Sequence, residues 1–297
     1  MAAKMMDTIV SELYEKNLTR TLYHYTSIGG LQGIVESRGI WATEIRYLND
    51  AKELVQTLDM FLSVIRAKYE SSDERTREFL RQLEEWLRHC LIDGHLVFVV
   101  SLSEQGNLLS QWRAYSPLGN GVSLGFDPQD LCTVAKQQGY RLGKCMYDGQ
   151  LQQRVIREIF GQIEKEAISS GPENDTSKRH PMNSYYSIFE KFEDDLLMCA
   201  ALLKHPAFRE EMEWRVVSSV VKRYAPSDIR YREGRSCLVP YRELSLVPTN
   251  ADRITLKEIF VGPTPNSNLS MRSVGMYLSN RGLSPLVANS LMPYRII

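Results

Sequence analysis

The sequence predicts a mixed fold of the α+β class, in which helical segments are inserted between strands. Apolar residues recur at helical spacing over residues 54–65 and again over 79–90, which is typical of helices with one buried face. Residues 95–103 form a continuous run of strand-forming residues, as a buried strand does. The stretch 213–261 is rich in strand-like segments. Because the order is neither a strict strand–helix alternation nor all strands, the α+β class fits best.

The individual elements follow from local signals along the chain. Ser27 can cap a helix that Gly39 ends, and Asn49 or Asp50 can cap a second helix, with Glu53 completing a capping box. The expected strands are residues 21–27, 40–43, 95–103, 121–127, 140–147, 213–220, 229–232, 237–242, 256–261 and 285–289. The expected helices are residues 28–37, 50–65, 73–91, 128–138, 150–169, 183–203 and 268–281, and residues 170–182 form the most loop-like stretch.

Composition limits the classes of protein that the chain can belong to. It has 297 residues, 43% hydrophobic and 24% charged, enough to bury a sizeable core. Lys plus Arg and Asp plus Glu number 36 each, a balance that argues against a wholly basic nucleic-acid coat protein. The five cysteines contain no C-x-x-C pair, so we expect no disulfide framework, no zinc site and a reducing, cytoplasmic setting. No stretch approaches the roughly 20 apolar residues of a membrane helix, and the start lacks a signal peptide's apolar run.

The expected domain organisation is one α+β domain over residues 21–297, preceded by an N-terminal helical appendage over residues 1–20. Apolar residues at helical spacing near the start of the chain predict this appendage. Residues 150–205 could be a helical insertion within the domain. The sequence contains no internal repeat and no low-complexity tract.

The first group of residues that could carry chemistry is Tyr23-His24-Tyr25-Thr26. Side chains alternate along a strand, so His24 and Thr26 share one face and can present two hydrogen-bonding groups to a bound sugar. The alternative is a partly buried histidine whose ring is satisfied by the backbone.

Two further groups follow in the next segment of the chain. Ser101 and Ser103 lie on one face of the strand that they close. Trp112, Arg113 and Tyr115 combine two aromatic rings and a cation, which suits a stacked ring and a phosphate. The alternative is an ordinary helical turn with Trp112 in the core and Arg113 in a salt bridge. Since neighbours on a helix point to different sides, we expect one aromatic residue in the core and the other beside a cleft.

The fourth group is Glu211-Met212-Glu213-Trp214-Arg215, at the start of an expected strand. In an extended chain Glu211, Glu213 and Arg215 project the same way, and two neighbouring carboxylates raise a pKa while Arg215 opposes that effect. The alternative is an exposed edge strand with alternating charges. The remaining histidines show no metal-ligand spacing, and the sequence contains no Gly-rich phosphate loop and no G-x-S-x-G elbow.

Taken in order, these segments resemble a widespread bacterial family of domains of unknown function, from about residue 22 to 295. The motifs that carry the resemblance are LYHYTS, GIVESRGIWAT, YLND, VSLSE, LSQWRAY, GVSLGFD, EMEWRVV, IFVGP and SLMPYR. A second, more distant resemblance is to the ADP-ribosyltransferase superfamily. The strand with His24 and Thr26, followed by a helix and Gly39-Ile40, is similar to the start of that fold, although Tyr25 stands where glycine is usual. Ser101-Leu102-Ser103 and Glu211-Met212-Glu213 are similar to its Ser-x-Ser and Glu-x-Glu elements.

The second resemblance implies a bent, split β core and NAD as co-substrate. It implies that Glu213 bonds the ribose and stabilises the oxocarbenium-like charge as nicotinamide leaves, and that Glu211 orients or deprotonates the acceptor. It also implies that His24 bonds the nicotinamide ribose or the adjoining amide. The other residues that it places around NAD are Tyr25, Thr26, Ser101, Ser103, Trp112 or Tyr115 on the nicotinamide ring, Arg113 on the pyrophosphate, and Arg215. We therefore expect His24, Ser101 or Ser103, and Glu213 to converge on one cleft.

The function expected from this resemblance is an NAD-dependent ADP-ribosyltransferase or an NAD glycohydrolase. By analogy with related bacterial enzymes it would act as a toxin or an antiphage defence effector, on a protein or nucleic-acid acceptor. One alternative is a non-catalytic module that senses a nucleotide or binds a partner. Another is an enzyme that removes phosphate from RNA ends, like the RNA 2′-phosphotransferases. Those enzymes use basic residues for that reaction, whereas the late Glu-x-Glu of this chain favours glycosidic chemistry.

Overall fold

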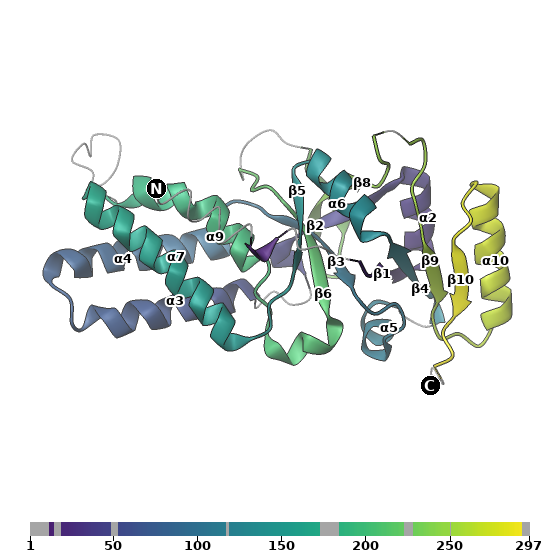
Figure 1. Cartoon of the computed structure of the whole chain (residues 1–297), viewed down its shortest axis with the longest axis horizontal. Coiled ribbons are helices and arrows are strands. Elements are labelled where there is room, and N and C mark those ends of the chain that lie inside the picture. The colour runs from purple at the N-terminus through teal and green to yellow at the C-terminus, as the bar shows by residue number, and fades with distance from the viewer. Residues whose placement is uncertain are drawn as a thin grey trace.

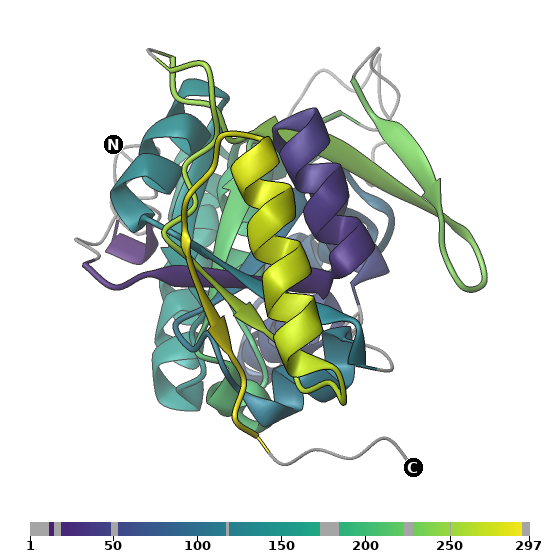
Figure 2. The same ribbon diagram turned by 90° about the vertical axis from the view of Figure 1, so that its right-hand side faces the viewer.

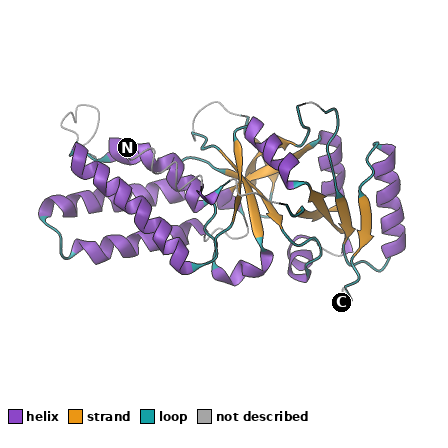
Figure 3. Cartoon of the chain, viewed as in Figure 1, coloured by secondary structure: helices purple, strands orange, loops and turns teal. Residues whose placement is uncertain are grey.

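The chain forms a mixed α/β structure with a helical lobe at one end and a mixed β-sheet at the other (Figures 1 and 3). The computed structural model describes residues 12–14, 19–48, 53–116, 119–172, 184–222, 228–249 and 251–292. No helix in these ranges is both long enough and apolar enough to cross a membrane. The expected mixture of helices and strands is thus confirmed.

The sheet follows the order β10-β9-β4-β1-β3-β2-β8-β7, and β6 pairs with both β3 and β5. The pairing is antiparallel everywhere except between β9 and β10, which run parallel. The strands are β1 (Leu22–Ser27), β2 (Gly39–Glu44), β3 (Phe98–Ser103), β4 (Gly121–Phe126), β5 (Tyr140–Lys144), β6 (Glu213–Ser218), β7 (Arg230–Glu233), β8 (Leu238–Ser245), β9 (Glu258–Val261) and β10 (Leu286–Asn289).

A split in the sheet lies beside β3. One edge of β3 pairs with β6 from Val99 to Ser103. The other edge pairs with β1 only at Tyr23↔Ser103, and with β2 only at Val99 and the preceding residue. Between these two short contacts, over residues 100–102, that edge of β3 has no strand partner among the described residues. The split positions the site described below.

The helices fall into two groups. The helical lobe consists of α3 (Glu53–Tyr69), α4 (Glu74–Arg88), α7 (Gly149–Ser170), α8 (Tyr186–Phe189) and α9 (Glu193–Ala200), with a π-helical turn at His89–Asp93 and a 3₁₀ turn at Glu190–Phe192. The remaining helices are α2 (Ile28–Ser37), α5 (Leu109–Tyr115), α6 (Pro128–Gln137) and α10 (Ser267–Asn280), with 3₁₀ turns at Ile45–Tyr47 and Pro206–Glu211. Residues 150–205 therefore supply only part of the helical lobe, because α3 and α4 come from an earlier stretch.

Two hydrophobic clusters form the core, and they meet at the sheet. The first gathers the apolar faces of the helical lobe, such as Phe61 and Leu83, and reaches β3 and β6 at Val99 and Val217. The second covers the opposite side of the same strands, where Val100 lies. Neighbouring residues of one strand thus belong to different clusters, as the alternation of side chains requires.

Local signals explain how α2 begins and correct how it ends. The Ser27 hydroxyl accepts a hydrogen bond from the Gly30 amide at 3.0 Å, so the predicted N-cap is confirmed. Gly39 was expected to stop the helix, but Arg38 does so in the left-handed region (φ 56°), and Gly39 opens β2. A side chain at Gly39 would lie within 3.1 Å of the Leu244 carbonyl on β8, so the glycine permits close strand contact.

Other expectations hold with shifted boundaries. The helix expected over 183–203 is broken into α8, a 3₁₀ turn and α9, and the strand expected from residue 95 begins at residue 98. The cap expected at Asn49 or Asp50 lies outside the described residues, as do most of the N-terminal appendage and of the loop at 170–182.

Candidate functional site

A small cavity lies at the split between β1 and β3. Its volume is about 50 Å³. It is lined by Tyr23, His24, Tyr25, Ser101, Leu102, Ser103, Gln111, Tyr115, Glu211 and Glu213. These residues come from β1, β3, α5 and the segment that leads into β6, so His24 and Glu213 meet although they are far apart in the sequence. The predicted convergence of His24, the two serines and Glu213 on one cleft is therefore confirmed.

His24 spans the split as a neutral ring. Its Nδ1 lies 3.0 Å from the Ser101 carbonyl oxygen. A carbonyl can only accept, so Nδ1 carries the proton and donates. Burial lowers the pKa of His24, which keeps the ring neutral at pH 7. In this tautomer Nε2 is left as a hydrogen-bond acceptor.

Tyr25 holds the loop that joins β3 to α5. Its hydroxyl donates to the Gln105 carbonyl and accepts from the Leu108 amide at 2.9 Å. Its ring packs edge-on against Trp112, with ring centroids 4.8 Å apart. Tyr25 thus has a local structural role.

The two aromatic residues of α5 divide their roles as predicted. Trp112 is buried and donates from Nε1 to the Asn107 side chain at 2.9 Å, whereas Tyr115 lines the cavity. Arg113, between them, is exposed. Trp112, Arg113 and Thr26 do not line the cavity, so their expected contacts with NAD stay predictions.

Ser103 ties β3 to the segment that precedes β6. Its hydroxyl donates to the Glu211 carbonyl at 2.7 Å and accepts from the Gln105 amide at 3.0 Å. In the register between β3 and β6, Ser103 stands opposite Glu213 and Ser101 opposite Arg215. The two serines therefore lie on the sheet face that carries these charged residues.

The surroundings of β6 correct two sequence expectations. The strand lies between β3 and β5 and all six of its residues are buried, so the alternative of an exposed edge strand is wrong. Glu211 was expected on the strand, but it ends the 3₁₀ turn Pro206–Glu211, and Met212 then adopts a left-handed conformation (φ 43°). Glu211 and Glu213 nevertheless reach the same cation, Lys204.

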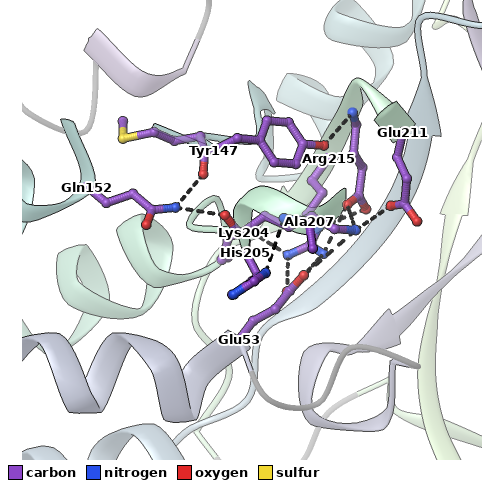
Figure 4. Close-up of polar contacts among 11 residues, drawn as sticks. Glu53, Tyr147, Gln152, Lys204, His205, Ala207, Glu211 and Arg215 are labelled. Atoms are coloured by element: carbon purple, nitrogen blue, oxygen red, sulfur yellow. Dashed lines mark hydrogen bonds and ion pairs between the residues drawn. The ribbon is translucent and has the colours of Figure 1, made fainter. Parts of the chain in front are cut away.

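Lys204 connects Glu211 and Glu213 inside the protein. Figure 4 shows Lys204 together with Glu211, Glu53 and Arg215. The Lys204 side chain is 1% exposed, and its Nζ donates to Oε2 of Glu211 at 2.6 Å and to Oε2 of Glu213. Burial would raise the pKa of Glu213, but the charges of Arg215 and Lys204 outweigh it and lower the pKa to about 2. The Tyr147 hydroxyl accepts from the Glu213 amide at 2.9 Å. Glu213 is therefore a fixed, ionised carboxylate.

Arg215 extends the cluster to the helical lobe. It is 1% exposed and does not line the cavity. Its guanidinium binds both oxygens of Glu53, the first residue of α3, at 2.6 and 2.9 Å, and also contacts Glu213 at 3.0 Å. The same group donates to the Ala201 carbonyl at 2.8 Å. Its predicted role in cofactor binding stays untested, and its observed contacts are internal.

Sequence reasoning missed Lys204 and Glu53. The sequence held one signal for Lys204, because this lysine directly follows the apolar run at 196–203. A lysine buried with that run would need a negatively charged partner. Glu53 was assigned to a helix start only, and nothing local marks its contact with a strand 162 residues away.

Comparison with known proteins gives one family match, over part of the chain. Residues 111–216 match the family described as "Protein of unknown function (DUF2971)". This agrees with the resemblance to a domain of unknown function. The match begins on α5 and ends in β6, so it includes Tyr115, Lys204, Glu211 and Glu213 but not His24. No curated protein and no solved structure matches the chain.

Residues 111–216 contain four of the five charged side chains in the cluster around Lys204, and Glu53 lies outside them. The five side chains of the cluster comprise three carboxylates (Glu53, Glu211 and Glu213) and two cations, Lys204 and Arg215. One negative charge is therefore in excess when all are ionised. None of the described residues that line the cavity is Lys or Arg. Such surroundings stabilise positive rather than negative charge.

Proposed function

We propose that the chain cleaves the nicotinamide–ribose bond of NAD, as an ADP-ribosyltransferase or an NAD glycohydrolase. The observation that carries the proposal is the meeting of His24, Ser101, Ser103, Glu211 and Glu213 in one cavity at the split of the sheet. They are among the residues to which the ADP-ribosyltransferase resemblance gives a role, with Glu211 acting on the acceptor and the others on NAD.

The proposed role of His24 follows from its tautomer. With Nδ1 held by the Ser101 carbonyl, Nε2 can accept a hydrogen bond from a ribose hydroxyl. A protonated ring would repel the positively charged nicotinamide group of NAD, and the lowered pKa of His24 avoids this.

The proposed role of Glu213 is electrostatic. The ribose gains positive charge as nicotinamide departs, and a carboxylate held ionised beside it stabilises that charge without moving. Glu211 stands beside it on Lys204, where it can orient the acceptor or the attacking water.

Size limits which part of NAD enters the cavity. A volume of about 50 Å³ holds a few water molecules or a small part of a nucleotide. The rest of the dinucleotide would therefore lie outside, with Tyr115 on the nicotinamide ring and Arg113, exposed on the same helix, near the pyrophosphate.

The test is nicotinamide release from NAD, with the pure protein alone and again with cell extract as a source of acceptor. Glu213→Gln should lower turnover about 100- to 1000-fold, since one well-placed electrostatic group contributes roughly 3–4 kcal/mol. NAD affinity should change far less. Glu104→Gln is the control, because Glu104 directly follows β3 and also pairs with a lysine but does not line the cavity. Equal turnover in the wild type and Glu213→Gln would contradict the proposal.

A second candidate is a non-catalytic module that binds a nucleotide in this cavity. The contact of Lys204 with both glutamates favours it, because two paired carboxylates are less able to act on a substrate. Saturable NAD binding without nicotinamide release, in buffer and in extract, would support this function. The RNA 2′-phosphotransferase alternative has less support, because the described cavity wall has no Lys or Arg to hold a phosphate. The effector role rests on analogy alone.

A further inference from the structure

An aromatic pair stands on the surface of the sheet, away from the cavity wall. Trp41 of β2 is 48% exposed, and its ring packs on Tyr241 of β8 with centroids 4.5 Å apart and planes tilted by 32°. Tyr241 is only 8% exposed, so Trp41 covers it. A tryptophan that leaves half of its surface in water contributes less to the core than its size allows, and an exposed ring is suited to stacking.

Two arginines of β7 flank this pair on the same face. In the register, Arg230 stands opposite Tyr241, and Tyr241 in turn opposite Thr43 of β2. Since opposite residues point to one face and alternate residues share it, Trp41, Tyr241, Arg230 and Arg232 lie together. We call these four residues the aromatic–arginine face. In Figure 2 the green β7–β8 hairpin projects from the side of the molecule.

Arg232 is only partly satisfied within the protein. Its Nη2 reaches the Thr43 hydroxyl at 3.4 Å, whereas its buried Nε has no hydrogen-bond partner among the described residues. A buried donor without a partner costs free energy, and few native groups are left so. By contrast, Arg230 is paired with Glu243 at 2.6 Å. The face therefore offers a stacking ring and, beside it, a half-buried cation that is only partly paired within the protein.

We propose that the aromatic–arginine face binds a short segment of single-stranded nucleic acid. One base stacks on the outer side of Trp41, and Arg232 donates to a phosphate or base oxygen of the same strand. This inference is independent of the proposed NAD chemistry.

The shape of the aromatic–arginine face favours single-stranded nucleic acid over a mononucleotide or a duplex. A mononucleotide site is concave, and none of the cavities described for this chain is lined by Trp41. An extended strand can instead run across β2, β8 and β7 and gather several weak contacts. A duplex hides its base faces and could not stack on Trp41. The zero formal charge of the chain limits the contact to a short segment.

The experiment measures fluorescence anisotropy of a labelled oligonucleotide of about 12 bases, as single-stranded DNA, as RNA and as a duplex. Trp41→Ala should weaken single-strand binding about 5- to 150-fold, the loss expected for one stacked base. Arg232→Gln should also weaken it and should lessen its dependence on salt between about 50 and 200 mM. Tyr231→Ala is the matched control. Tyr231 is 62% exposed on the same hairpin but points to the opposite face, so binding should persist.

Three outcomes would overturn the proposal. They are the absence of binding at low salt, equal binding of the duplex, and an equal loss in Tyr231→Ala and Trp41→Ala. Circular dichroism of each variant shows whether it folds, and Arg232→Gln gives a second test if Trp41→Ala does not. The NAD assay above has separate variants and a separate readout, so neither result decides the other.

Discussion

At the scale of single residues, Lys204 helps to keep the glutamates of the site ionised. It is almost completely buried, yet it carries the charge that both Glu211 and Glu213 contact. Its Nζ also lies 5.1 Å from the centre of the Phe208 ring, which stabilises a cation. Burial would lower the pKa of Lys204, but Glu213 and Glu211 raise it above its usual value. Lysine and glutamates therefore keep one another ionised.

Replacing Lys204 should be costly. Lys204→Met leaves the buried carboxylate of Glu213 and the partly buried one of Glu211 with one cation fewer. Breaking a buried ion pair typically costs about 3–5 kcal/mol. Urea unfolding measures this loss. Lys144→Met is the control, because Lys144 pairs with Glu104 at a half-exposed position and such pairs contribute about 1 kcal/mol or less. Similar losses in the two variants would show that the cluster is not a coupled unit.

The charge state of Glu213 should make stability depend on pH in acid. Its pKa falls from an ordinary 4.5 to about 2 in the folded protein, so the unfolded chain binds the proton more tightly. Stability from this residue is therefore complete above about pH 4.5 and is lost as the pH falls toward 2. Unfolding measured from pH 6 down to 2.5 should show a stability gap between wild type and Glu213→Gln that narrows on acidification. A constant gap would contradict the lowered pKa.

At the scale of elements, the sequence predicts what depends on neighbours along the chain. The Ser27 cap and the apolar faces of α3 and α4 are local signals, and each is found in place. The burial of β6 could not be predicted, because alternating charged residues usually indicate a solvent-exposed strand. Those charges are satisfied by Lys204 and Glu53, which approach only in the folded chain. The left-handed Met212 likewise has no local signal, since glycine is the residue expected there.

The contact between β2 and β8 should be sensitive to Gly39. In Gly39→Ala the added carbon would lie 2.9 Å from the Glu243 side chain and 3.1 Å from the Leu244 carbonyl. The side chain can move but the backbone cannot, so we expect a loss of about 1–3 kcal/mol in unfolding free energy. Gly33→Ala in α2 has nothing within 4 Å of the added carbon and should be neutral or stabilising by up to about 1 kcal/mol. A larger loss at residue 33 than at 39 would refute this account.

At the scale of the whole molecule, the helical lobe and the sheet share two strands. Val99 and Val217 pack into the lobe, while their neighbours Val100 and Val216 pack on the other side. The ion pair between Glu53 and Arg215 joins the same two parts. The two hydrophobic clusters therefore cannot separate without disrupting β3 and β6.

We accordingly expect the lobe and the sheet to unfold in one transition. Far-ultraviolet circular dichroism and tryptophan fluorescence should give coincident urea curves, since Trp86 lies in the lobe and Trp214 in the sheet. Leu83→Ala in the lobe and Leu124→Ala in the sheet should each shift both curves equally, by about 2–5 kcal/mol. Separate midpoints for the two signals would identify two independent folding units.

At the split beside β3, the side chain of His24 lies between β1 and β3. An antiparallel ladder continued from Tyr23↔Ser103 would set Tyr25 against Ser101. Instead, the Ser101 carbonyl accepts from the imidazole of His24, and the two strands part around the ring. The side chain of His24 thus keeps β1 and β3 apart at this point. A residue too short to reach that carbonyl would let β1 and β3 pair further along their length, and the cavity between them would close.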